Sequence, residues 1–247
     1  MIKTLSVLFH NGRQFIPDVI NASLKPPFRG RPIITNVKID EKKAVELCPV
    51  GAISRNPFSI DLGKCVFCGE CSIEFPEKII FTQDYKLATN IRERLIIKEG
   101  EDIPITIDKS QIRPDIKKIC KKSLKLREIS AAGDNSAEWE MNASNNVQFD
   151  ISRYGIEFVA SPRHADGILI TGPISQNMAK AVEICYDATP EPQIIILAGT
   201  DAISGGIFNG SRAICRDFIK NNHIDLYIPG NPPHPLTIIN GLLNLID

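Results

Sequence analysis

The sequence predicts a two-part α/β protein, in which a short cysteine-rich module precedes a domain built on a parallel β-sheet. Four of the seven cysteines lie between Cys48 and Cys71, and strand-length apolar segments alternate with helical stretches after about residue 155. Hydrophobic residues make up 43% of the 247-residue chain, which is enough for a core of normal size. Basic and acidic side chains balance at 29 each, so the charge gives no reason to expect a nucleic-acid partner.

The chain divides into four segments. Residues 1–34 are rich in Pro, Arg and Asn and predict an extended N-terminal arm, and residues 35–88 hold the cysteine cluster among strand-like pieces. Residues 89–130 are predicted to form a charged connector, and residues 131–247 the C-terminal domain. No apolar run reaches the roughly 20 residues of a membrane-spanning helix, and the N-terminus lacks the features of a signal peptide. We therefore expect no transmembrane segment, and any membrane association through partner proteins.

The C-terminal domain is predicted to contain a parallel sheet. Buried parallel strands are covered on both faces and therefore read as near-continuous apolar runs. Such runs occupy residues 155–161, 167–173, 193–200 and 224–230, and helices are expected over residues 175–187, 209–221 and 236–246. Strands that alternate with helices form a parallel sheet with right-handed crossovers, and ligands bind beyond the carboxyl ends of its strands.

Three of the clustered cysteines stand on one tight loop with the spacing Cys65-x-x-Cys68-x-x-Cys71. In ferredoxins with two clusters, each cysteine run is C-x₂-C-x₂-C-x₃-C-P, and its fourth cysteine ligates the other cluster. This chain keeps the triplet of the second run and the Cys48-Pro49 of the first, while Phe75 occupies the position of the second run's fourth cysteine. Cys48, Cys65, Cys68 and Cys71 are therefore predicted to hold a single [4Fe–4S] cluster.

Two alternatives to this cluster are zinc and a site without metal. Cys₄ zinc sites usually combine two paired knuckles, whereas the triple spacing together with CPVGAI favours iron–sulfur. The odd number and the clustering of the cysteines argue against a disulfide framework and favour a reducing, cytoplasmic compartment.

Several segments of the sequence resemble those of a known family. FRGRP, CPVGAI and CVFCGEC resemble the iron–sulfur modules of membrane-bound [NiFe]-hydrogenases. The segments LREISAAGDNSAEWEMNA, SPRHADGILITGP, GTDAISGGIF and IPGNPPHP resemble the small subunit of group 4 hydrogenases and the proximal-cluster 20 kDa subunit of complex I, NADH:quinone oxidoreductase. From about Arg29 onward, the resemblance implies a ferredoxin-like α+β module followed by a flavodoxin-like parallel-sheet α/β domain.

The resemblance also exposes a departure from the family. Members bind a proximal [4Fe–4S] cluster through cysteines in three loops, and the matching positions here are Asp134, Ala137, Asp201 and Asn231. Oxygen donors are not the soft thiolates that such a cluster requires, and alanine offers no donor. The proximal cluster is therefore expected to be absent. The oxygen-bearing side chains could converge around a hard cation, but a hydrogen-bonded or solvated filling is the favoured interpretation.

The resemblance implies an iron–sulfur electron-transfer or structural subunit of a membrane-associated hydrogenase-like or complex I-like oxidoreductase, not catalytic alone. Its expected partners are a large subunit and membrane subunits, on the inner face of the cell membrane. Arg163 and His164 in SPRHAD are candidates for a partner-facing loop, or alternatively an ordinary surface arginine and a hydrogen-bonded histidine. The rival hypotheses are a cluster-independent scaffold or assembly protein and a stand-alone small-molecule-binding protein.

Overall fold

The C-terminal domain of the computed structural model, which describes residues 2–12, 15–120 and 123–246, is built on a five-stranded parallel sheet. The strands lie in the order β7-β6-β8-β9-β10. They comprise β6 (Leu124–Ser130), β7 (Ile156–Phe158), β8 (Gly167–Thr171), β9 (Ile194–Ala198) and β10 (Leu226–Ile228). Numbered along the chain, this order is 2-1-3-4-5, which is the flavodoxin-like order. The predicted fold class and the four predicted strands are thereby confirmed.

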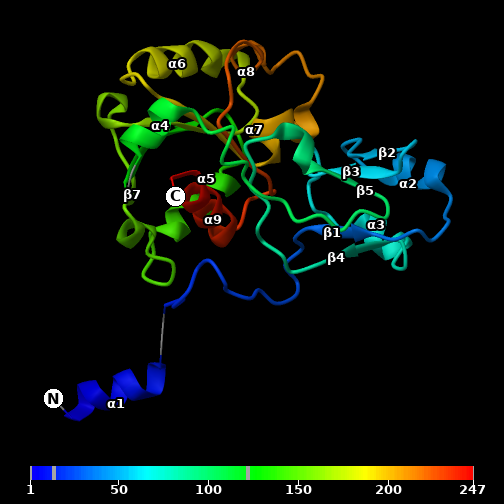
Figure 1. Ribbon diagram of the computed structural model, residues 1–247, viewed down its shortest axis with the longest axis horizontal. Helices are drawn as coiled ribbons and strands as arrows, with labels where there is room; N and C mark the ends of the chain where they lie inside the picture. The colour runs from blue at the N-terminus through cyan, green and yellow to red at the C-terminus, as the bar shows by residue number, and fades with distance from the viewer. Residues whose placement is uncertain (1, 13–14, 121–122, 247) are drawn as a thin grey trace.

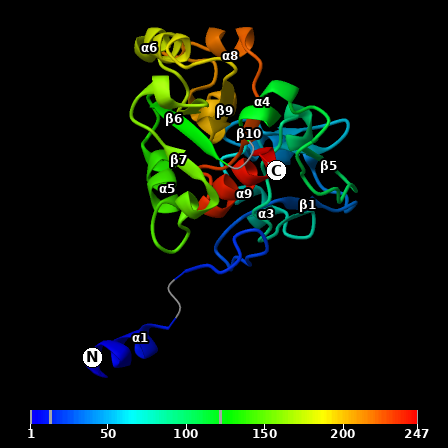
Figure 2. The ribbon, with the colours of Figure 1, turned by 60° about the vertical axis from the view of Figure 1, so that its left-hand side comes forward.

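Helices cover both faces of this sheet. They are α5 (Ser136–Ser144), α6 (Gln176–Asp187), α7 (Thr200–Ser204), α8 (Asp217–Asn221) and α9 (Pro235–Ile246), with short 3₁₀ turns η2 (Ile151–Tyr154), η3 (Pro162–His164) and η4 (Gly206–Phe208). Successive strand residues point to opposite faces. Ile168 and Ile170 of β8 therefore share a core cluster with Val182 of α6, whereas Leu169 packs in the cluster of α9. In Figures 1 and 2, α6 and α8 lie on one side of the sheet, and α5 and α9 on the other.

Two predictions for this domain were wrong in part. The last residues of the predicted connector form β6, a strand between β7 and β8 in the sheet; its charged Lys125, Arg127 and Glu128 conceal the alternation of its buried positions. The helix expected over residues 209–221 is limited to α8. Residues 209, 210, 212 and 213 form turns, Ile214 forms a bridge with Ser175, and the Cys215 amide donates to the Ile174 carbonyl at 2.8 Å.

The N-terminal module combines two small antiparallel sheets with short helices, as expected for an α+β unit. One sheet pairs β1 (Pro32–Ile34) with β4 (Ile79–Phe81), and the other has the order β2-β3-β5, with β2 (Ile53–Ser54), β3 (Ser59–Asp61) and β5 (Ile96–Lys98). The helices are α2 (Glu41–Leu47), α3 (Glu70–Glu74) and the turn η1 (Arg92–Leu95), and α4 (Pro114–Ile119) follows in the connector.

The N-terminal arm differs from its prediction. Residues Ile2–Asn11 form a helix, α1, instead of an extended chain, and this helix stands apart from the remainder in Figures 1 and 2. Its apolar side chains Leu5, Leu8 and Phe9 are exposed. Among the described residues, no helix is both long enough and apolar enough to cross a bilayer.

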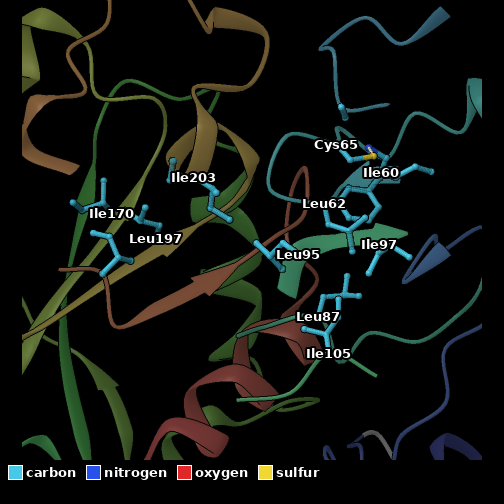
Figure 3. Packing of buried hydrophobic residues seen from close by; sticks show 14 of the residues in the cluster. Ile60, Leu62, Cys65, Leu87, Leu95, Ile97, Ile105, Ile170, Leu197 and Ile203 are labelled. Carbon is cyan, nitrogen blue, oxygen red and sulfur yellow. Dashed lines mark hydrogen bonds between the residues drawn. The ribbon is translucent and has the colours of Figure 1, made fainter. Parts of the chain in front are cut away.

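The module and the C-terminal domain share one hydrophobic core. Figure 3 shows Ile60, Leu62 and Leu95 of the module in the same buried cluster as Ile170 and Leu197 of the sheet. Leu62 and Leu95 are fully buried. Because side chains from both parts are in mutual contact, the cysteine loop has a fixed position against the sheet domain.

The approach of the arm to the module depends on a glycine. A Cβ atom at Gly30 would lie 2.0 Å from the Asp84 carbonyl oxygen, a backbone atom that cannot move away easily. We therefore expect Gly30→Ala to lower the free energy of unfolding by about 1–3 kcal/mol, the range for overpacking, as measured by urea denaturation. Gly51 serves as the comparison, because it has open space but a φ of 60°. A loss at Gly30 no larger than that at Gly51 would contradict the steric account.

Candidate metal centre

The four predicted thiols come from three places in the module and line one cavity. Cys48 follows the last turn of α2, Cys65 and Cys68 lie on the loop between β3 and α3, and Cys71 lies in α3. The remaining walls of this thiol cavity are mainly apolar and include Leu47, Val50, Ala52, Ile53, Ile60 and Phe81. The structure thus brings together the four side chains that the sequence singled out.

The cysteine loop is shaped by positive backbone angles and by two glycines. Phe67 has a φ of 52° and Gly69 a φ of 87°, a region that glycine adopts without steric cost. At Gly63 a Cβ would lie 2.6 Å from the Arg92 guanidinium carbon. Arg92 in turn donates two hydrogen bonds of 2.8 Å to the Asp61 carboxylate. Gly63 therefore makes room for the ion pair at the base of the loop.

Backbone amides point at two of the sulfurs. The Ala52 N–H donates to Cys48 Sγ at 3.2 Å, and the Phe67 N–H donates to Cys65 Sγ at 3.3 Å. Hydrogen bonds to ligand sulfurs tune the reduction potential of a bound iron–sulfur cluster. Burial, and secondarily the neighbouring thiols, raises the pKa of Cys65 to about 12 and that of Cys71 to about 11. Without metal these thiols are protonated at neutral pH, so metal binding must release their protons.

The donor set fits a [4Fe–4S] cluster, because that group takes four cysteine thiolates in a largely apolar setting. Within the described ranges, no group of three or more His, Cys, Asp or Glu side chains meets the geometry for a single metal ion. A cubane makes a different demand, since each of its irons takes its own thiolate. A zinc ion instead gathers four sulfurs at about 2.3 Å from one point. The fit to a cluster rests on donor chemistry and on the shared thiol cavity.

One hydroxyl joins the cysteine loop to the sheet domain. Thr200, the first residue of α7, is fully buried, and its Oγ1 lies 2.8 Å from the Cys65 carbonyl oxygen and 3.2 Å from that of Gly230. The Thr200 N–H also donates to the Gly230 carbonyl at 2.8 Å. The loops that follow β9 and β10 are therefore tied directly to the backbone of a cluster ligand.

The four positions predicted to correspond to the family's proximal ligands do converge. Asp134, Ala137, Asp201 and Asn231 all line a small pocket, here the Asp201 pocket, beyond the carboxyl ends of the parallel strands. No cysteine lines this pocket. Its volume is about 10 Å³, close to the minimum that one water molecule needs.

The pKa values of Asp134 and Asp201, two acidic residues of the Asp201 pocket, are shifted in opposite directions. Two hydrogen bonds from Ser136, from its hydroxyl and its N–H, lower the pKa of Asp134. Burial, followed by the charges of Asp134 and Glu138, raises the pKa of Asp201. Glu138 is buried and accepts hydrogen bonds of 2.6 Å from the hydroxyls of Ser130 and Thr171. Asp134 and Glu138 are thus held by hydroxyl groups of the chain itself, while the filling predicted for Asp134, Asp201 and Asn231 together stays a prediction.

Arg163 and His164 lie away from both sites. They belong to η3, are exposed, and do not line the thiol cavity or the Asp201 pocket. Their loop leads from β7 back to the start of β8, where the Lys125 N–H donates to the Asp166 carboxylate at 2.7 Å. Their role in contacting a partner stays a prediction.

Three residues that position these sites are not among those predicted from the sequence. Arg29 donates from Nε to the Phe67 carbonyl at 2.6 Å, Thr200 bridges two loops, and Glu138 accepts two buried hydrogen bonds. The glycines of the loop around Thr200, and its place after a predicted strand, indicated a functional edge of the sheet. The hydrogen-bond partner of the Thr200 hydroxyl is the Cys65 carbonyl, 135 residues away, and no local sequence pattern indicates this pairing.

Fold and site define a flavodoxin-like α/β domain extended by a module with four clustered thiols. Residues 135–245 match the family model of the NADH ubiquinone oxidoreductase 20 kDa subunit. The chain is 34% identical to formate hydrogenlyase subunit 7 of Escherichia coli over 144 residues. These aligned residues cover 58% of this chain and 56% of that subunit. The matches support the family indicated by the sequence motifs, whose members include oxidoreductase subunits of the hydrogenase and complex I kinds.

Two further relatives point the same way. The probable membrane-bound hydrogenase subunit mbhJ of Pyrococcus furiosus is 29% identical over 143 residues, which is 57% of this chain and 86% of that one. An NADH-quinone oxidoreductase subunit of Clostridium beijerinckii is 43% identical over 107 residues, 43% of this chain and 63% of the relative. The matched region thus spans less than two thirds of the hydrogenlyase and quinone-oxidoreductase subunits.

The opposite pKa shifts of Asp201 and Asp134 predict opposite effects of their amide substitutions. A raised folded-state pKa means that ionising Asp201 costs stability, and this cost grows as the pH rises above the unfolded value near 3.8. Asp201→Asn is expected to raise the free energy of unfolding at pH 7, with a gain that vanishes in acid. Asp134→Asn is expected to lower it at pH 7, because the ionised Asp134 is stabilised.

Urea unfolding of the wild type and both variants between pH 3 and pH 7 tests this pair. The two stability differences should have opposite signs at neutral pH and should both shrink in acid. Equal losses for both variants across this range would show that the carboxylates are equivalent structural groups and would contradict the assignment.

Proposed function

We propose that the protein is an iron–sulfur electron-transfer or structural subunit of a membrane-associated oxidoreductase complex of the hydrogenase or complex I kind. In this proposal it carries one [4Fe–4S] cluster on Cys48, Cys65, Cys68 and Cys71, and it lacks the proximal cluster of its relatives. When bound, the cluster supplies one-electron transfer. The observation that carries the proposal is the single cavity lined by all four thiols, with amide groups directed at two of the sulfurs.

The link through Thr200 supports a function that involves both parts of the chain. The Thr200 hydroxyl donates to the Cys65 carbonyl and lies within 3.2 Å of the Gly230 carbonyl, so the cluster loop lies next to the loops of the Asp201 pocket. In the proposed subunit, electrons entering at the thiol cavity find no thiol-bound centre at the Asp201 pocket. The next redox centre then belongs to a partner, or the cluster has a structural role.

The partners proposed from the family resemblance are a large subunit and membrane subunits, with the protein held peripherally on the inner face of the membrane. Apolar side chains near the Asp201 pocket suit such docking. Trp139, one residue after Glu138 in α5, is 69% exposed, and Ile207 in η4 is 68% exposed. Exposed large apolar groups around a functional edge are typical of interaction surfaces.

A second candidate function is a cluster-independent scaffold or assembly protein of such a complex. The filling of the Asp201 pocket by carboxylates that the chain's own hydroxyls hold favours it, since this edge could then bind a partner without redox chemistry. The two functions differ in whether the thiol cavity binds iron.

Anaerobic purification of the full chain, followed by iron and sulfide analysis and EPR after dithionite reduction, tests the proposal. About four irons per chain and one cluster signal are expected. Cys68→Ala should abolish both, because it removes one of four ligands. Cys185→Ala is the matched control, because Cys185 lies in α6, outside the thiol cavity, and should leave both unchanged.

The opposite outcomes are equally informative. About eight irons per chain would mean that the C-terminal domain binds a second cluster, against the proposal. A protein that holds zinc, or no metal at all, would exclude electron transfer by this chain and favour the scaffold.

A further inference from the structure

A second cavity is lined in part by the cysteine loop. This Arg29 cavity, of about 140 Å³, is formed by the segment before β1, by Phe67 of the cysteine loop, and by the residues between β10 and α9. Its walls include the apolar side chains of Phe28, Phe67, Leu87, Pro229 and Pro232. A cavity of about 150 Å³ in another protein accommodates a benzene ring, so this one has room for a ligand of similar size.

The cavity contains a buried hydroxyl group without a partner. Thr237, in the first turn of α9, is 1% exposed, and its Oγ1 has no hydrogen-bond partner among the described residues. It lines the cavity together with His234. A buried hydroxyl that lacks a hydrogen bond destabilises the fold, and an acceptor supplied by a ligand would offset that cost.

Two further donors accompany this hydroxyl. His234 Nδ1 accepts from the Leu236 N–H at 3.1 Å, so the neutral ring carries its proton on Nε2. Arg29 uses Nε for the Phe67 carbonyl, and its two terminal NH₂ groups form no hydrogen bond or ion pair within the part of the chain that the structure describes. The Arg29 side chain is therefore oriented by the cysteine loop while its outer donors remain available.

The charge of this cavity has one sign. Arg29 is the only charged residue among those that line it, and no Asp or Glu is present. The first turn of α9, a 12-residue helix, contributes the lining residue Thr237, so the positive end of a helix dipole adds to the same field. The cavity thus has hydrogen-bond donors and one positive charge in its polar part, and aromatic and proline side chains on its other walls. A matching ligand is an anion that is rich in hydrogen-bond acceptors and has an apolar body.

We propose that the Arg29 cavity is a binding site for a small organic carboxylate whose apolar part is about the size of one ring. The carboxylate pairs with the Arg29 guanidinium, accepts from the Thr237 hydroxyl or His234 Nε2–H, and its apolar part lies against Phe28 and Phe67. A guanidinium and a carboxylate match as planar groups with charge-assisted hydrogen bonds. None of the four cysteines lines the site, so benzoate binding and iron content can be measured separately.

Isothermal titration of the purified full chain with benzoate tests the site, with benzamide and inorganic phosphate as comparison probes. Benzoate is expected to bind saturably, and benzamide at least about 10-fold more weakly, because it lacks the charge. Phosphate is expected to bind at least about 10-fold more weakly as well, because apolar walls cannot replace its hydration.

Variants assign the binding to this cavity. Arg29→Gln should weaken benzoate binding about 10-fold or more, and Thr237→Val, which keeps the side-chain shape, by about 3-fold or more. Arg212→Gln is the matched control, because Arg212 is exposed and does not line the cavity. Thermal unfolding of each variant without ligand verifies that the variant is folded. If Arg29→Gln is not folded, the benzoate affinity of Thr237→Val alone tests whether binding occurs in this cavity.

The absence of saturable benzoate binding would overturn the proposal. So would equal affinities of the wild type, Arg29→Gln and Thr237→Val, or phosphate binding as tight as that of benzoate. Iron analysis of the same samples separates this result from the proposed function: benzoate binding without iron would contradict the cluster alone, and iron without benzoate binding would contradict the carboxylate site alone.

Discussion

The buried hydroxyl of Thr200 is the contact on which the relation between the two parts of the chain depends. It lies within hydrogen-bonding distance of the Cys65 carbonyl in the module and the Gly230 carbonyl in the loop after β10. Both acceptors are backbone atoms, so the interaction fixes the course of the two loops, not merely two side chains. A buried carbonyl left without its donor costs about 1–3 kcal/mol, so the contact is expensive to lose.

The Thr200 contact lies where three sites come close together. The thiol cavity, the Asp201 pocket and the Arg29 cavity all include residues of the cysteine loop or of the loops that follow β9 and β10. Phe67 lies between two of the thiols in sequence and also lines the Arg29 cavity, where its carbonyl orients the guanidinium. A ligand that neutralises Arg29 would therefore change the electrostatic environment of the cysteine loop. The shared core of both parts packs the cysteine module against the sheet domain.

The sequence carried the main features of the fold, because long apolar runs such as residues 193–200 have few alternatives to a buried strand. It concealed β6, since a strand with Lys125, Arg127 and Glu128 has the composition of a solvated segment, and only pairing on both edges makes it part of the sheet. The cysteine quartet was readable because its spacing is local. The Thr200 link, the orientation of Arg29 and the hydrogen bonds of Glu138 were not, because each depends on contacts between loops that only the tertiary fold brings together.

The most direct test of a single cluster held against the sheet domain is native mass spectrometry of the full chain, prepared without oxygen. One added mass corresponding to four irons and four sulfides is expected, retained in Asp201→Asn and lost in Cys48→Ser. A mass for two clusters, or for a single zinc ion, would contradict the single cluster.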